Sequence, residues 1–164
     1  MPNIKGVQLE EYGGDGTFGS HWEETILLGE YMTGAMYEEE QSISEFTLAL
    51  LEDTGNYKAN YYTGGLMKYG KNKGCDFINS KCVNNGEINS KFENEYFDAY
   101  NMKYDDIDPS CTSGRQSRVY SALISYNKHQ IPKQYQYYSK NPLLGGVRPS
   151  ADFLSNFFQR YSFI

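Results

Sequence analysis

Turn-forming residues interrupt this 164-residue chain so often that few long helices or strands can form. After residue 63 the interruptions come every few residues: Gly64 and Gly65, Gly70, Gly74, the run NNG at 84–86 and the pair DP at 108–109. Glycine and Asn-Gly pairs favour turns, because they adopt backbone conformations that other residues avoid. We therefore expect loops and short extended segments over residues 64–164.

One helix stands out against this background, over residues 42–54. Ser42 and Glu45 have the spacing of a capping box, in which each side chain binds a backbone N–H of the other's turn. The helix is expected to carry one apolar face, because four apolar residues recur at helical spacing: Ile43, Phe46, Leu50 and Leu51. Gly55 follows, where a helix end favours a left-handed glycine.

Weaker patterns predict short strands at residues 4–10 and 119–125. Apolar residues also follow a helical period within residues 92–104 and from Phe153 to Tyr161, and residues 131–138 are rich in tyrosine. No internal repeat and no Pro/Ser-rich linker divides the chain. We therefore expect a single α+β domain over residues 1–164, irregular and rich in loops.

Composition and charge exclude several classes of protein. The 16 tyrosines and 9 phenylalanines argue against a disordered chain, which is usually poor in aromatic residues. A net charge of −6, without any Lys/Arg run, argues against a nucleic-acid partner or an anionic membrane surface. No apolar run approaches the ~18 residues of a membrane-spanning helix, and the first residues lack the apolar core of a signal peptide. Taken literally, these features predict a soluble, cytosolic chain.

The three cysteines, Cys75, Cys82 and Cys111, leave two interpretations open. Their number is odd, and the spacing of the first two is wider than in common zinc-binding motifs. They are either unpaired thiols or members of a disulfide framework whose partners are missing.

The run GSHWE at residues 19–23 places His21, one of only two histidines, on a glycine-rich loop. Catalytic zinc needs about three protein ligands, usually including an HExxH motif on a helix, and that motif is absent from the chain. His129 also lacks a second histidine four residues away. By itself a lone histidine in a loop indicates a structural residue, and Met32 by itself indicates core packing.

Two further sequence patterns lie near His21. GxGxxG at residues 14–19 formally matches a dinucleotide fingerprint, but we reject it because no helix is expected to follow. The acidic residues Glu23, Glu24 and Glu30 predict the charged rim of an exposed loop, although they could in principle act as a base or as metal ligands.

Together, these pieces resemble the leishmanolysin family of zinc metallopeptidases. The runs GVQLE (6–10), GGDGT (13–17) and GSHWE (19–23) are similar to the segment around the family's third zinc-binding histidine. EYM at 30–32 falls where the family carries its Met-turn. The similarity continues through FTLALLEDTG (46–55), YKANY (57–61) and MKYGKNKGCDF (67–77) to KC (81–82), and more weakly at CTS (111–113) and ADF (151–153).

The resemblance implies a metzincin-like zinc endopeptidase of the cell surface or the secretory route, acting on proteins or peptides. In that family two histidines of an HExxH helix and a third from a C-terminal subdomain hold the zinc, and the glutamate of the helix polarises the zinc-bound water. His21 would be the third zinc ligand, and Met32 would lie beneath the metal as the Met-turn. Zinc is the only cofactor that the resemblance implies.

The departures from the family pattern limit this expectation. HExxH and its glutamate are absent, so the chain is expected to be a C-terminal part of such a peptidase, from a truncated gene or an incomplete gene model. It would hold no catalytic residue and be inactive without an N-terminal lobe. The cysteines fit bonds whose partners lie outside this segment, and Leu154 stands where the family commonly has a cysteine.

Two other functions are considered. A non-catalytic binding or adhesion module would use the tyrosines of residues 135–138 as a contact surface, because aromatic residues often anchor interfaces. We favour half-buried packing for those tyrosines. A degenerate fragment would have no function and would expose the face that a missing lobe covers.

Overall fold

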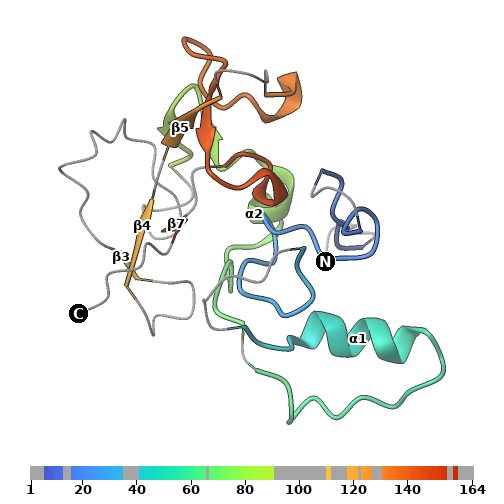
Figure 1. Ribbon diagram of the computed structural model, residues 1–164. Coiled ribbons are helices and arrows are strands. Elements are labelled where there is room, and N and C mark those ends of the chain that lie inside the picture. The colour runs from blue at the N-terminus through green and yellow to red at the C-terminus, as the bar shows by residue number, and fades with distance from the viewer. Residues whose placement is uncertain are drawn as a thin grey trace, which may run out of the picture.

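The structure of the protein, a computed structural model, describes residues 6–12, 16–34, 41–65, 67–90, 110–111, 118–121, 123–126, 131–154 and 157–158. Short helices and small antiparallel sheets are joined by long loops (Figure 1). The expected α+β class is therefore confirmed. The predicted extent of the domain, residues 1–164, remains a prediction.

Two α-helices and two 3-10 helices are described. They are α1 (Glu45–Asp53), α2 (Cys75–Asn79), η1 (Lys133–Tyr135) and η2 (Pro149–Ala151). The predicted helix at 42–54 corresponds to α1, but its capping box is wrong. Ser44 is the N-cap, and its side chain accepts a hydrogen bond from the Phe46 N–H. Ser42 instead forms a parallel bridge with Glu30, which keeps its backbone out of the helix.

Gly55 follows α1 with φ 75°, as predicted for a left-handed helix end. The helix α2 was not predicted, because glycines surround it. Its packing explains one of them: a Cβ on Gly70, which has φ 67°, would lie 2.5 Å from the Phe77 ring. That glycine therefore lets the chain pass close to the aromatic residue that α2 buries.

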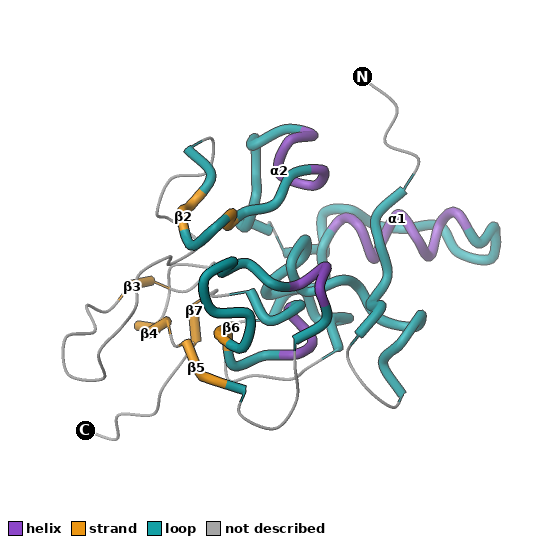
Figure 2. Tube along the Cα trace, turned by 90° about the horizontal axis from the view of Figure 1, so that it is seen from above, coloured by secondary structure: helices purple, strands orange, loops and turns teal. Residues whose placement is uncertain are grey.

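The strands form three small sheets, which lie on the side of the molecule away from α1 (Figures 1 and 2). They are β1 (Val83–Asn84), β2 (Glu87–Ile88), β3 (Ser110–Cys111), β4 (Arg118–Ser121), β5 (Leu123–Ser125), β6 (Leu144–Gly146) and β7 (Phe157–Phe158). β1 pairs with β2 across the NNG turn, β5 pairs with β6, and β4 lies between β3 and β7. All these pairs are antiparallel.

The strand predicted at 119–125 is largely confirmed, as β4 and β5. The strand predicted at 4–10 is wrong over the described residues 6–10, where only Leu9 forms an isolated bridge, to Trp22. The helical period from Phe153 to Tyr161 is wrong at residues 157–158, which pair with β4, while Tyr161 lies outside the described residues. Residues 92–104 also lie outside them.

Two apolar clusters form the core of the described part. The larger one contains Leu28, Tyr69, Phe77, Cys82, Val83, Ile131, Tyr135, Tyr137, Tyr138, Phe153 and Leu154. The smaller one contains Trp22, Ile26 and Leu27. The tyrosines of residues 135–138 are at most 8% exposed. They are therefore packing residues, and the contact surface that the binding-module interpretation assigned to them is not there.

Candidate functional site

The loop that carries His21 is closed by backbone hydrogen bonds to Glu10. The Glu10 N–H donates to the His21 carbonyl at 2.9 Å, and the Gly19 N–H donates to the Glu10 carbonyl at 2.8 Å. Gly16 and Gly19 have φ values of 96° and 69°, which other residues rarely adopt. The glycines of this loop therefore allow the tight turn that presents His21.

The imidazole of His21 is half-buried, and its Nδ1 nitrogen makes hydrogen bonds within the loop. Nδ1 lies 3.3 Å from the Thr17 carbonyl oxygen and 2.9 Å from Ser20 Oγ. A histidine that ligates a metal commonly donates its other ring N–H to a backbone carbonyl, which fixes the ring. Donation from Nδ1 to Thr17 leaves Nε2 as the nitrogen for a metal, so this geometry fits one zinc ligand.

The described residues do not form a complete zinc site. Within them no three His, Cys, Asp or Glu side chains lie close enough to hold a metal together. Since catalytic zinc takes about three protein ligands, the described residues could fill at most the one position that fits His21.

Backbone hydrogen bonds bring the Met32 segment next to the His21 segment. The Trp22 N–H donates to the Met32 carbonyl at 2.8 Å, and Trp22 forms a parallel bridge with Thr33. The Thr33 N–H and hydroxyl both donate to the Glu30 carbonyl, at 3.3 and 2.9 Å, which closes a turn over residues 30–33. Met32 thus lies in a turn beside the histidine loop, and its position beneath a metal remains a prediction.

The carboxylate of Glu30 ties this turn to α1. It is fully buried and accepts hydrogen bonds from the Met32 N–H, from the N–H and hydroxyl of Ser44, and from the Thr47 hydroxyl. The Thr47 hydroxyl also accepts from the indole of Trp22 at 2.9 Å. The Glu30 carboxylate therefore holds the turn and the start of α1 directly, and Trp22 through Thr47.

A second buried carboxylate, Glu24, joins the histidine segment to the far end of the chain. Arg148 Nη1 lies 2.7 Å from Glu24 Oε1, and the Ser150 hydroxyl donates to Oε2 at 2.6 Å. Both charged side chains are at most 2% exposed. Removing one partner would leave an uncompensated buried charge, which is far more costly than losing an exposed pair.

A third carboxylate, Glu23, accepts from the N–H and hydroxyl of Thr25 at 3.0 and 2.9 Å. Burial raises the pKa of Glu23 to about 7. Burial also raises the pKa of Asp152 to about 8, with a further contribution from the charge of Glu23. Burial disfavours the charged form of each acid, and the neighbouring carboxylates disfavour it further.

The expectation that Glu23, Glu24 and Glu30 form an exposed charged rim is therefore wrong, since each is at most 1% exposed. Glu24 is bound by residues 148–150, and Glu30 by Ser44 and Thr47, so the local sequence does not reveal these partners. Glu23 is bound by Thr25, two residues away. One local sequence feature does indicate that these acids are buried, the apolar run TILL at 25–28. Its residues Ile26, Leu27 and Leu28 are buried, so the acids beside them lie close to the core.

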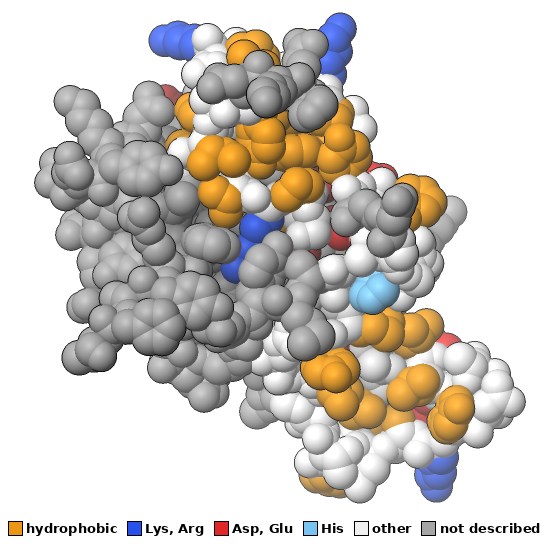
Figure 3. Space-filling model, in the orientation of Figure 1, with side chains coloured by type: hydrophobic (Ala, Val, Ile, Leu, Met, Phe, Trp, Pro, Cys, Tyr) orange, Lys and Arg blue, Asp and Glu red, His pale blue; other side chains and the backbone are white. Residues whose placement is uncertain are grey.

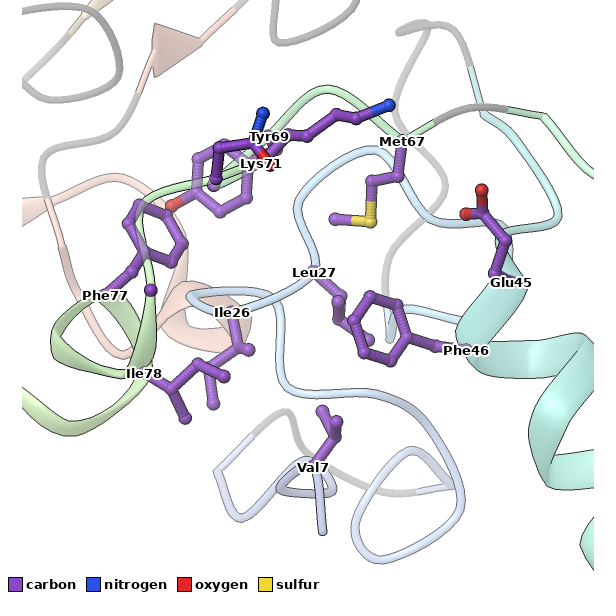
Figure 4. A pocket seen from close by; sticks show the side chains of 13 residues that line it. Val7, Ile26, Leu27, Glu45, Phe46, Met67, Tyr69, Lys71, Phe77 and Ile78 are labelled. Atoms are coloured by element: carbon purple, nitrogen blue, oxygen red, sulfur yellow. The ribbon is translucent and has the colours of Figure 1, made fainter. Parts of the chain in front are cut away.

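An apolar pocket of about 250 Å³ lies between this segment, the start of α1 and α2. Figure 4 shows the Phe46 side chain directed at Leu27, with Met67 above and Val7 below. The sequence did not suggest this pocket, because its lining comes from four separate segments.

Cys75 and Cys82 are free thiols in the structure, and the side chain of Cys111 lies outside the described residues. Burial raises the pKa of Cys82 to about 12, so its thiol is unreactive. Leu154, at the position where the family commonly has a cysteine, is 2% exposed and fills the core. Partners outside this segment remain a prediction for all three cysteines.

A comparison of the sequence with known protein families assigns the chain to one of them. The family model for leishmanolysin, peptidase family M8, matches residues 1–162. The chain therefore belongs to the leishmanolysin family of peptidases.

Individual relatives support the same assignment. The chain is 35% identical over 134 residues to a leishmanolysin-like peptidase of Drosophila melanogaster, covering 81% of this chain and 19% of the relative. It is 35% identical over 154 residues to one of Caenorhabditis elegans, covering 89% and 22%, and 29% identical over 149 residues to the leishmanolysin of Leishmania donovani, covering 90% and 23%. The chain thus spans about a fifth of the length of these relatives.

Proposed function

We propose that this chain supplies the third zinc ligand and the Met-turn of a zinc-dependent endopeptidase whose other ligands lie outside these 164 residues. The observation that carries the proposal is the orientation of His21: its Nδ1 contacts Thr17 and Ser20, which leaves Nε2 available to bind a metal. Membership of a peptidase family supports the same role.

Each nearby residue has a defined part in this proposal. His21 binds zinc, and the Thr17 carbonyl and Ser20 hydroxyl orient its ring. Glu30 holds Met32 in its turn, where the methionine would form an apolar floor beneath the metal. When bound, zinc activates water for attack on a peptide carbonyl.

The chain by itself is proposed to have no peptidase activity. A single imidazole does not hold catalytic zinc against water and competing ligands, and the general base of HExxH is absent from the sequence. Activity would require a lobe with the HExxH helix, and the substrates would then be proteins or peptides. We further propose a location at the cell surface or in the secretory route. Among the described residues no helix is long and apolar enough to cross a membrane.

A chimeric enzyme tests this function. The matching region of the Caenorhabditis elegans relative is replaced by the whole of this chain, and turnover of a fluorogenic peptide is measured with and without a chelator. We expect chelator-sensitive turnover, and a loss in kcat/KM of more than about 100-fold for His21→Ala, since even residues that support a metal ligand are worth 10–100-fold. Lys58→Ala, in an exposed loop, is the matched control.

Two results would refute the proposal. One is undiminished activity in the His21→Ala chimera. The other is chelator-sensitive turnover by the 164-residue chain alone.

A further inference from the structure

The segment from Ile43 to residue 65, here called the α1 arm, carries an exposed apolar surface. It consists of α1 and the loop after it, which extend from the body of the molecule in Figure 1. Seven of its large apolar side chains are 39% to 100% exposed: Ile43, Phe46, Leu50, Leu51, Tyr57, Tyr61 and Tyr62. Figure 3 shows hydrophobic side chains gathered over α1, next to the histidine that the structure describes. Many large apolar side chains exposed together usually mark an interaction site.

The helix α1 is well capped but poorly packed. Ser44 caps its start, Gly55 ends it, and none of its nine residues is buried. Isolated helices shorter than ~12–15 residues are marginal in water, because most helix stability in proteins comes from packing of an apolar face. Among the described residues, the hydrogen bonds that fix α1 to the body lie at its start: Ser44 and Thr47 bind Glu30, and Trp22 binds Thr47. Further along the helix, Leu50 and Leu51 are each 39% exposed to solvent.

The arm is adjacent to the proposed zinc ligand. Trp22, the residue after His21, donates its indole N–H to Thr47 of α1. Phe46 joins the arm to the apolar pocket, whose lining includes Ile26 and Leu27. A polypeptide that approaches His21 over this face therefore meets several exposed apolar side chains.

We propose that the apolar surface of the α1 arm, together with the pocket at Phe46, is the docking surface for the peptidase lobe that carries the HExxH helix. This inference rests on the proposed function, because that lobe must bring two further ligands to His21. The relatives are long enough to contain such a lobe, since this chain corresponds to about a fifth of their length. The surface of α1 also carries Glu45, Glu52 and Asp53 and no Lys or Arg, so the lobe should present basic residues at the rim of the contact.

Hydrogen exchange tests the docking. The α1 amides are measured in the 164-residue chain alone and in the chimeric peptidase that contains it. We expect exchange of residues 48–53 to slow by at least 10-fold in the chimera. Unchanged exchange in an active chimera would overturn the docking while leaving the proposed function intact. Protection in a chimera that neither binds zinc nor cleaves peptide would support the docking and refute the function.

Substitutions separate docking from folding. Leu50→Ser combined with Leu51→Ser should leave the unfolding midpoint of the chain alone almost unchanged, since both side chains are half-exposed there. In the chimera the same pair should abolish the protection of α1, whereas Lys58→Ser in the same arm should not. Equal protection in the double variant would overturn the proposal. Protection that rises with concentration in the chain alone would do so too, by identifying a second copy as the occupant.

Discussion

Substitution of Glu30 by glutamine tests the idea that a buried carboxylate fixes the turn at residues 30–33. Oε1 accepts three hydrogen bonds, from the Ser44 N–H and hydroxyl and from the Thr47 hydroxyl, whereas Oε2 accepts only the Met32 N–H. An amide has one carbonyl oxygen, so it satisfies the three donors at Oε1 and turns its NH₂ group towards Met32. Glu30→Gln should therefore release the turn and leave the start of α1 in place.

The expected cost follows from that single lost bond. A hydrogen bond to a charged group contributes about 1.5–3 kcal/mol, and here a backbone donor is also left facing another donor. We expect the free energy of unfolding to fall by about 2–3 kcal/mol. Glu30→Ala, which removes all four bonds, should cost more and is the limiting case.

Urea unfolding followed by tryptophan fluorescence measures this cost. Trp22 is the only tryptophan, is 6% exposed, and is linked to Glu30 through Thr47, so its emission reports the site itself. Hydrogen exchange should accelerate at the Met32 amide more than at the Ser44 amide. Glu87→Gln, on an exposed strand residue, controls for the loss of one charge. A change below 0.5 kcal/mol, or equal acceleration at both amides, would refute the reasoning.

Three further predictions concern the frame around the site. The folded state raises the pKa of Asp152 from 3.8 to about 8, so its contribution to stability is complete below pH 3.8 and is lost as the pH rises through 8. Asparagine also adopts the left-handed backbone of residue 152, where φ is 51°. Asp152→Asn should therefore raise the thermal unfolding midpoint at pH 9 more than at pH 5. An equal rise at both pH values would contradict this. Arg148→Met should cost about 3–5 kcal/mol in urea unfolding, because it leaves Glu24 buried and uncompensated, and adding Glu24→Gln should recover part of the loss. Gly70→Ala should lower the melting temperature more than Gly55→Ala: both have positive φ, but only at Gly70 would a Cβ meet a ring, at 2.5 Å.

Local sequence patterns predicted the local features of the fold. Helical spacing and Gly55 located α1, and NNG at 84–86 predicted the turn between β1 and β2, because these signals act within a few residues. The capping box failed since Ser42 is held by Gly29 and Glu30, residues outside the helical pattern. The C-terminal helical period failed because residues 157–158 pair with β4, and strand pairing overrides a short periodic run.

The candidate site also contains features that the sequence could predict and features that depend on distant residues. The family resemblance predicted His21 as a zinc ligand and Met32 as the Met-turn, and both stay predictions. The chemistry of the two residues alone would not have predicted either role. The buried acids were missed because Glu24 is neutralised by Arg148, 124 residues away, and Glu30 is satisfied by α1. A carboxylate whose partners are distant in sequence looks like any surface acid until the fold is known.

Zinc stoichiometry tests the central claim, that His21 supplies one ligand of a shared zinc site. Zinc is measured by plasma mass spectrometry after dialysis, in the 164-residue chain, in the chimeric peptidase and in its His21→Ala variant. We predict about one zinc per molecule in the chimera and close to none in the other two samples. One zinc per molecule retained by the His21→Ala chimera, or by the chain alone, would contradict the claim.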